Sequence, residues 1–349
     1  MKKTFIKEIK EKDHVAGEFL VTRKEAGISK SGKPYLNLKL MDSTGELEAR
    51  VWESAEELGR AFQKNDVVSV KGFAVAYQGG IQINVTAVSA LKEGEYSIRD
   101  FLPCSKKDPA AMMAEVDGII SGLNDTHLRT LLSSIFNDAE IRERFMAAPA
   151  AKVMHHPYLG GLIEHVLSIC GLAEAVVKHY GSGINRDLLI TGAILHDIGK
   201  IYELSYKKSF DYTDEGRLLG HITMGIELID RTLAGQKDFP HDLAVLLKHM
   251  LLSHHGQLEF GSPKRPKTIE AVILYYLDDL DSKVNTLQSL ITEEGEGDSP
   301  WTPYQRLFER YIYRGKPSAA PEGRPSNAAA NGSKDDKADK TDKTLSLFR

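Results

Sequence analysis

The periodicity of the apolar residues changes once along this chain, near Ser97, and no other feature constrains the fold as strongly. Before that point, short runs rich in β-branched and aromatic residues alternate with turn signals such as SKSGK, STG and QGG. After it, apolar residues recur with a spacing of about 3.6, which is typical of amphipathic helices. The sequence therefore predicts a β-domain followed by an all-α domain, with no strand among the helices.

The first part has the layout of an OB-fold barrel, which has five strands and a helix after the third. Another small β-barrel is the alternative. The predicted strands cover residues 14–23, 34–42, 46–53, 66–77 and 81–91, with one short helix within 54–65. The predicted helices of the second part cover residues 108–123, 126–136, 160–180, 186–197, 221–233, 242–255 and 269–291.

These elements predict an α+β multidomain protein with four regions. We expect an OB-fold domain over residues 1–92, a helical connector over 93–148 and an all-α domain over 149–314. Residues 315–349 are mostly small and polar, so they have little to bury, and we predict a disordered tail.

Composition excludes several classes of protein. The chain has 349 residues and a net charge of -4, so any surface that binds nucleic acid must be local. Two cysteines, Cys104 and Cys170, are too few for a disulfide scaffold or a four-cysteine zinc site. No apolar run reaches the roughly 18 residues that cross a bilayer, and the N-terminus lacks a signal-peptide core. We therefore expect a soluble cytoplasmic protein without a membrane partner.

Histidines are concentrated in the helical part. Of the 12 in the chain, ten lie between His155 and His255. Helical spacing places one set of histidines and aspartates on apolar stripes that face inward. Buried carboxylates without lysine or arginine on the same stripes need a cation, and a divalent metal is the simplest answer. A neutral His–Asp hydrogen-bond network is the alternative. The inward set is His165, His196, Asp197, His254 and Asp278.

The order of these residues carries a family resemblance. His165, the His196-Asp197 pair in AILHDIGK, and Asp278 resemble the H…HD…D signature of HD-domain metal-dependent phosphohydrolases. The segment HHPYLGGLIEHVL resembles YhaM-type 3′-5′ exoribonucleases, which also place an OB-fold before the HD domain. The resemblance covers residues 1–310 and implies that residues 149–314 are an HD-domain phosphohydrolase.

The resemblance also implies two metal ions that share Asp197 as a bridge. His255 is an alternative or outer ligand, and Asp279 and Asp281 compete with Asp278, with Asp281 a candidate for the second shell. Imidazole and carboxylate ligands suit Mn²⁺, Fe²⁺, Co²⁺ or Zn²⁺, and the resemblance favours Mn²⁺. The first ion would take His165, His196, Asp197 and Asp278, and the second Asp197, His221 and His254.

Several other residues are candidates for contact with a substrate. Lys200 could act with His196 and Asp197 by placing its ammonium on a phosphate, or it could be a solvated residue near a helix end. Weaker candidates are Lys207, Lys208 and Arg217, with His155 and His156 at the substrate entrance. In the first domain, we expect nucleic acid to contact Arg23, Lys24, Lys30, Lys33 and Tyr35. Phe19, Trp52, Phe73 and Tyr77 could also stack on bases or could belong to the core.

These features favour a metal-dependent phosphodiesterase acting on single-stranded RNA or DNA, and the resemblance favours 3′-5′ exonucleolysis of RNA. One alternative is an HD hydrolase of nucleotides or cyclic dinucleotides. The other is a nucleic-acid-binding scaffold with an inactive HD domain. A homo-oligomer is possible. The C-terminal run Leu345–Phe348 resembles peptides that bind the DNA sliding clamp, although Thr344 replaces the usual glutamine.

Overall fold

The computed structural model describes residues 4–152, 155–293 and 299–315. The described residues divide into two compact units, one that ends at Leu290 and one that begins at Ile291. The predicted tail lies outside the described residues except for Gly315, and so does the clamp-like run Leu345–Phe348. Among the described helices, none is both long and apolar enough to span a bilayer.

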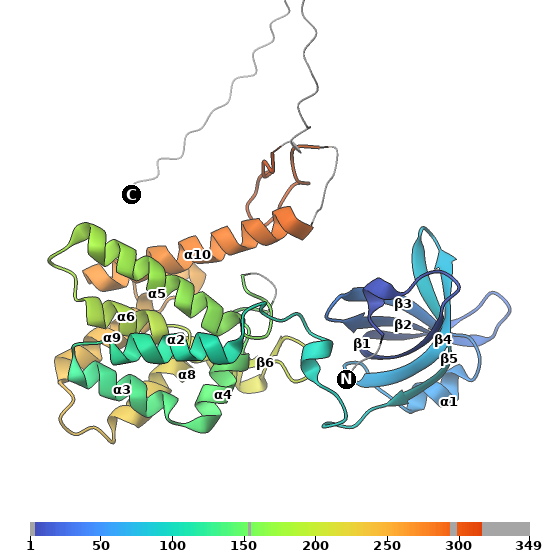
Figure 1. The fold of residues 1–349 in the computed structure, drawn as a ribbon, viewed down its shortest axis with the longest axis horizontal. Helices are drawn as coiled ribbons and strands as arrows, with labels where there is room; N and C mark the ends of the chain where they lie inside the picture. Colours follow the sequence, from blue (N-terminus) through green and yellow to red (C-terminus); the bar gives the residue numbers. More distant parts are fainter. Residues whose placement is uncertain (1–3, 153–154, 294–298, 316–349) are drawn as a thin grey trace, which may run out of the picture. The chain divides into compact units, whose positions relative to one another are not determined.

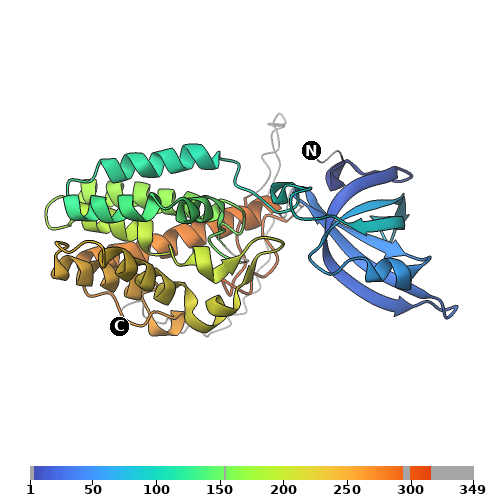
Figure 2. The ribbon, with the colours of Figure 1, turned by 90° about the horizontal axis from the view of Figure 1, so that it is seen from below.

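The predicted OB-fold is confirmed as a closed barrel with the strand order β1-β2-β3-β5-β4 (Figures 1 and 2). The β3 and β5 strands pair in parallel and the other neighbours are antiparallel, while helix α1 (Ala55–Arg60) joins β3 to β4. The strands are β1 (His14–Ile28), β2 (Pro34–Asp42), β3 (Gly45–Val51), β4 (Val67–Tyr77) and β5 (Gly80–Ala90).

Alternate residues of each strand fill the barrel, as the pleat requires. Phe19, Leu38 and Ile83 are fully buried there. Gly72 lies at a bulge between β4 and β5, where a Cβ would stand 2.3 Å from the carbonyl oxygen of Asn84. Only glycine permits that approach, which lets the strands curve into a closed barrel.

The second part is helical, as predicted, with two additions and one error. Helices α4 and α7 were not predicted, and the expectation of no strand among the helices is wrong because β6 (Leu204–Ser205) pairs with β7 (Asp211–Tyr212). The helices are α2 (Pro109–Ser121), α3 (Thr126–Phe136), α4 (Ala139–Ala147), α5 (Gly161–Tyr180), α6 (Arg186–Leu195), α7 (Lys200–Glu203), α8 (Asp214–Leu233), α9 (His241–Ser253) and α10 (Ile269–Glu293). Short 3-10 turns are η1 (Ile6–Glu8), η2 (Ile98–Asp100) and η3 (Leu258–Phe260).

Helix α6 is the centre of the helical core. Residues 187–195 are all buried, which marks a helix that is covered on every side. It packs against α5 and α9, and α2 packs against α5 (Figures 1 and 2). The residues that follow α6 are therefore delivered to the interior of the helical core.

Candidate functional site

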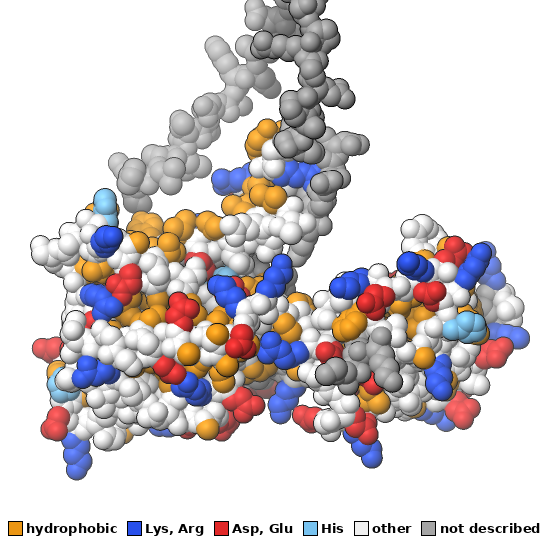
Figure 3. Space-filling model, in the orientation of Figure 1, with side chains coloured by type: hydrophobic (Ala, Val, Ile, Leu, Met, Phe, Trp, Pro, Cys, Tyr) orange, Lys and Arg blue, Asp and Glu red, His pale blue; other side chains and the backbone are white. Residues whose placement is uncertain are grey.

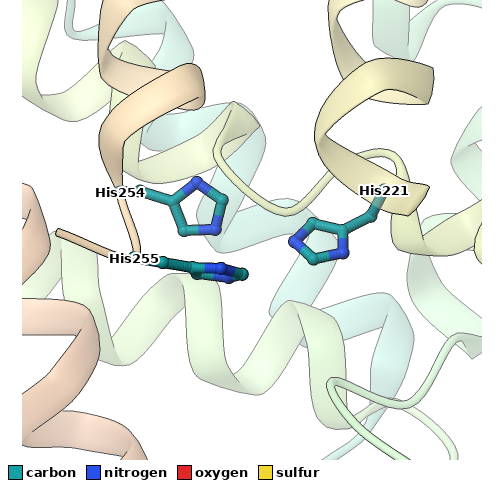
Figure 4. A group of neighbouring side chains, drawn as sticks. All are labelled: His221, His254 and His255. Atoms are coloured by element: carbon teal, nitrogen blue, oxygen red, sulfur yellow. The ribbon is translucent and has the colours of Figure 1, made fainter. Parts of the chain in front are cut away.

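The six predicted metal ligands converge from five helical segments. His165 lies within α5, the His196-Asp197 pair follows α6, and His254 follows α9. Helix α8 is broken at Gly220, whose φ of 75° is in the left-handed region, and the break places His221 at the start of the second helical segment. Figure 4 shows His221, His254 and the adjacent His255 turned toward one another.

The two carboxylate oxygens of Asp197 face two different pairs of imidazoles. Its Oδ2 lies 3.7 Å from Nε2 of His165 and 3.2 Å from Nε2 of His196. Its Oδ1 lies 3.5 Å from Nε2 of His221 and 3.6 Å from Nε2 of His254. Asp197 is therefore the common neighbour of both pairs, which is the arrangement that a bridging carboxylate needs.

The atoms that face this common space are buried without a partner. Nε2 of His165, His196, His221 and His254, and Oδ1 of Asp197, find no hydrogen-bond partner among the described residues. Buried polar atoms without a partner are costly, and each needs an explanation. A cation that accepts these lone pairs supplies one, so the donor set fits a metal centre.

The opposite nitrogen of each ring is anchored, which orients its Nε2. Nδ1 of His196 donates to the carbonyl oxygen of Ala193 at 2.9 Å, and Nδ1 of His254 to that of Leu251 at 2.8 Å. A ring that donates through Nδ1 keeps its lone pair on Nε2, the tautomer of a metal ligand. Nδ1 of His165 meets Asp281 at 2.7 Å, and Nδ1 of His221 meets Glu203 at 3.0 Å.

The three competing aspartates of α10 have different surroundings. Asp278 places Oδ1 3.3 Å from Nε2 of His165, inside the donor set. Asp279 instead pairs with Lys283 at 2.7 Å and is partly exposed. Asp281 lies behind His165 and also receives the hydroxyl of Ser168 and Nε2 of His156, the latter at 3.1 Å.

Three groups of side chains could each hold an ion, within the ranges that the structure describes. Ligand atoms within each group lie no more than 4.8 Å apart. His255 enters one of them, and its Nδ1 donates to the carbonyl oxygen of Phe260 at 2.9 Å. The groups are His165, His196 and Asp278; His221, His254 and His255; and His156, His165 and Asp281.

Charges at the centre are strongly coupled. Burial alone would raise the pKa of Asp197, but the ammonium of Lys200, 2.6 Å from Oδ2, and the imidazole of His196 hold it well below the usual range. Burial lowers the pKa of His254 well below its ordinary value, so this ring is neutral. Burial opposes the charged form of His165, yet the carboxylates of Asp278 and Asp281 outweigh it and raise its pKa to about 9.

A cavity of about 210 Å³ opens beside the donor set. Lys200 lines it and is only 8% exposed, so the alternative of a solvated lysine is wrong. His156 is buried against Asp281 and is not among the lining residues, which corrects its predicted place at the entrance. The lining residues are His155, Lys200, His254, His255, Phe260, Tyr275, Asp278, Asp279 and Ser282.

The weaker phosphate candidates lie elsewhere. Arg217 pairs with Asp211 at 3.0 Å, and Lys208 pairs with Asp66 at 2.8 Å. Lys207 lines two other cavities. Glu203 was missed by sequence analysis, because its four-residue helix is too short to show a periodicity.

Two families match this chain. The HD domain family matches residues 162–283, and a family described as an OB-fold nucleic acid binding domain matches residues 15–91. A protein named 3′-5′ exoribonuclease YhaM, from Geobacillus sp. (strain WCH70), is 37% identical over 273 residues, 78% of this chain and 83% of that protein. The chain belongs to the YhaM family. The resemblance found in the sequence is confirmed, and neither alternative function is favoured.

Two solved structures are similar to part of this YhaM-family chain. The second OB-fold domain of replication protein A from Methanococcus maripaludis is 19% identical, with a TM-score of 0.22, and covers 27% of this chain and 98% of that one. The mitochondrial single-stranded DNA binding protein Rim1 from S. cerevisiae is 16% identical, with a TM-score of 0.20, and covers 24% of this chain and 97% of that one.

Two of the basic residues predicted on the barrel of this YhaM-family protein have structural partners. Arg23 pairs with Glu48 through two contacts of 2.8 and 2.9 Å. Lys24 donates to the carbonyl oxygens of Gly59 and Phe62, both at 2.6 Å, at the end of α1. The exposed cations of the β1–β2 loop are Lys30 and Lys33.

An aromatic platform on the barrel consists of Tyr35, Arg50, Trp52 and Tyr77. The rings of Tyr35 and Trp52 stack with centroids 5.1 Å apart and an angle of 29° between their planes. The guanidinium of Arg50, a residue not singled out in the sequence, lies 4.8 Å from the Tyr77 centroid and 5.4 Å from that of Trp52. Trp52 and Tyr77 are 42% and 44% exposed, whereas Phe19 is fully buried and therefore belongs to the core.

Proposed function

We propose that this protein is a metal-dependent phosphodiesterase that shortens single-stranded nucleic acid, and RNA first, from the 3′ end. The observation that carries the proposal is the convergence of four unpartnered imidazole nitrogens on the buried carboxylate of Asp197. The activity named for the 37% identical relative supports the same reaction.

The donor set divides into two ion sites in this proposal. His165, His196, Asp197 and Asp278 hold the first ion, and Asp197, His221 and His254 hold the second, with His255 as an outer ligand. Mixed imidazole and carboxylate donors favour Mn²⁺ over Mg²⁺, although Fe²⁺, Co²⁺ and Zn²⁺ suit them as well. When bound, such ions lower the pKa of water and stabilise charge that develops on phosphoryl oxygens.

The protein's own groups position the scissile phosphate in this scheme. Lys200 lines the cavity beside Asp278, so its ammonium can contact a phosphate oxygen that enters there. Phe260 and Tyr275 supply the aromatic part of the same lining, which suits the sugar and base of a terminal nucleotide. His155 lies in this lining with an unpartnered, buried Nδ1, and burial lowers its pKa to about 3, so the ring is neutral.

Strand binding is assigned to the barrel. The aromatic platform offers stacking surfaces and a guanidinium within a few ångströms of each other, and Lys30 and Lys33 add positive charge at the β1–β2 loop. Every base has a π-face, so stacking of this kind tolerates any sequence. The barrel would hold the strand while its 3′ end occupies the cavity.

The test uses purified protein with Mn²⁺ on 5′-labelled single-stranded RNA and DNA of the same sequence. We expect a ladder of products shortened from the 3′ end, with RNA degraded faster. The matched control is Asp197→Asn, which keeps the shape of the side chain and removes its charge. Hydrolysis of cyclic dinucleotides with both strands left intact would contradict the proposal.

A further inference from the structure

The last described segment, residues 299–315, forms a hairpin that is rich in aromatic residues and arginine; we call it the C-terminal hairpin. Trp301 bridges to Tyr313 and Gln305 to Arg310. The N–H of Thr302 donates to the carbonyl oxygen of Ile312 at 2.9 Å, which closes the two arms. The HD domain match ends at residue 283, so it does not include this hairpin.

Its large rings lie on the surface. Trp301 and Tyr313 are 48% and 56% exposed with ring centroids 4.9 Å apart, and they meet edge to face. Tyr304 and Tyr311 are 50% and 61% exposed and form a second pair at 5.3 Å. Exposed aromatic surface of this density is uncommon on a monomer and marks a surface that binds something.

Charge indicates what it binds. The hairpin contains three arginines and a single acidic residue, Glu309. Arg306 and Arg310 are exposed, and Nε of Arg310 donates to the carbonyl oxygen of Phe308 at 2.7 Å, which orients its guanidinium. Figure 3 shows basic and hydrophobic side chains side by side on this part of the chain.

We propose that the C-terminal hairpin binds single-stranded nucleic acid, with its rings against bases and its arginines against phosphates. The inference rests on the proposed function and adds a second strand-binding surface to the barrel. Aromatic rings interleaved with cations match a ligand in which flat bases alternate with anionic phosphates. A purely apolar partner would desolvate the exposed guanidiniums of Arg306 and Arg310, which is costly.

The sequence supplies a direct reporter, because its two tryptophans, Trp52 and Trp301, lie on the two proposed surfaces. Trp52→Phe leaves Trp301 as the single tryptophan, and Trp301→Phe leaves Trp52. Each full-length variant is titrated, in EDTA to prevent hydrolysis, with an RNA of about 15 nucleotides, the upper range for one binding domain. We expect the emission of Trp301 to be quenched by RNA as its ring stacks on a base.

Two further variants separate rings from charges. Tyr311→Ala combined with Tyr313→Ala should weaken the RNA affinity reported by Trp301 by about 5- to 150-fold for each ring that stacks on a base. Arg306→Ala combined with Arg310→Ala should reduce the slope of log affinity against log salt by about 1.4, or about 0.7 for each lost phosphate contact. Circular dichroism and an unchanged Trp52 response verify that these variants are folded.

The outcomes distinguish this inference from the proposed function. If RNA changes the emission of Trp52 but not that of Trp301, the hairpin site is overturned and the barrel site is retained. If RNA changes the emission of neither tryptophan and is not hydrolysed in Mn²⁺, both the hairpin site and the proposed function are overturned. A Trp301 emission that depends on protein concentration but not on RNA identifies a protein–protein contact and also overturns the hairpin site.

Discussion

Replacing Asp281 with asparagine tests whether the ring of His165 is held ready for a metal ion. Oδ2 of Asp281 faces Nδ1 of His165 at 2.7 Å and Nε2 of His156 at 3.1 Å, and all three groups are buried. Asparagine keeps the shape and one acceptor oxygen but removes the negative charge. The anchoring hydrogen bonds then lose the part of their strength that comes from the charged acceptor.

The expected loss of Mn²⁺ affinity follows from the strength of the hydrogen bond between Asp281 and His165. A hydrogen bond to a charged group contributes about 1.5–3 kcal/mol and a neutral one about 1 kcal/mol, so the bond to His165 weakens by about 0.5–2 kcal/mol. That range corresponds to an affinity loss of about 2- to 30-fold, and residues behind a metal ligand commonly show losses of about 10- to 100-fold. Both ranges include a loss of about 10-fold, so we expect Mn²⁺ to bind Asp281→Asn about 10-fold more weakly.

Isothermal titration of metal-stripped protein with Mn²⁺ measures the change. The matched control is Asp279→Asn. It also removes one negative charge from α10, but it breaks a surface pair with Lys283 and leaves Asp281 in place. The variants should differ in metal affinity and agree in helix content. Equal Mn²⁺ affinities for Asp281→Asn and Asp279→Asn would refute the proposed anchoring of His165.

Four further predictions address the centre, the fold and the barrel. Asp197→Ala should lower RNA hydrolysis by at least about 100-fold, because each ion contributes several kcal/mol, and elemental analysis should find less bound metal; normal turnover would exclude a bridging role. Mn²⁺ at 100 times its dissociation constant should stabilise the stripped protein by about 2.7 kcal/mol, seen as a rise in Tm, and an unchanged Tm would contradict a metal site. Gly199→Ala should destabilise the protein by at least about 1–3 kcal/mol in urea unfolding, because its Cβ would lie 2.0 Å from the carbonyl oxygen of His221. Trp52→Ala should weaken RNA binding by about 5- to 100-fold with hydrolysis of a small phosphodiester unchanged, and an equal loss on both substrates would count against strand binding at the barrel.

The helices and strands with a strong periodicity of apolar residues could be predicted from the sequence. Strands β2 and β3 alternate buried apolar residues with more exposed ones, and that alternation is visible in the sequence without knowledge of their neighbours. His165 shares a helical stripe with Leu162 and Ile169, and both are buried in the structure together with it. Whether a side chain of a helix points inward thus depends on the local spacing of apolar residues, so it can be predicted from the sequence.

What could not be predicted depends on contacts between distant segments. Lys24 was predicted as a nucleic-acid contact in the loop between the first two strands, but its ammonium donates to the carbonyl oxygens of Gly59 and Phe62 at the end of α1. In ELEARVWE, Arg50 resembles any exposed charged residue of a strand. It belongs to the aromatic platform only because Tyr35 and Tyr77, which lie on other strands, pack beside it. Glu203 has a role only through the approach of His221, 18 residues later. No local sequence pattern indicates these contacts.

The balance of charge around the candidate centre sets an order of binding. Four carboxylates, those of Asp197, Glu203, Asp278 and Asp281, surround it, and Lys200 contributes an ammonium on Asp197. A phosphodiester is anionic, so the centre repels it until cations arrive. Two divalent ions reverse the sign of the local charge, and repulsion becomes attraction. In the proposed two-ion centre, the ions would therefore enter before the strand end does, and we expect protein without metal to bind RNA without cutting it.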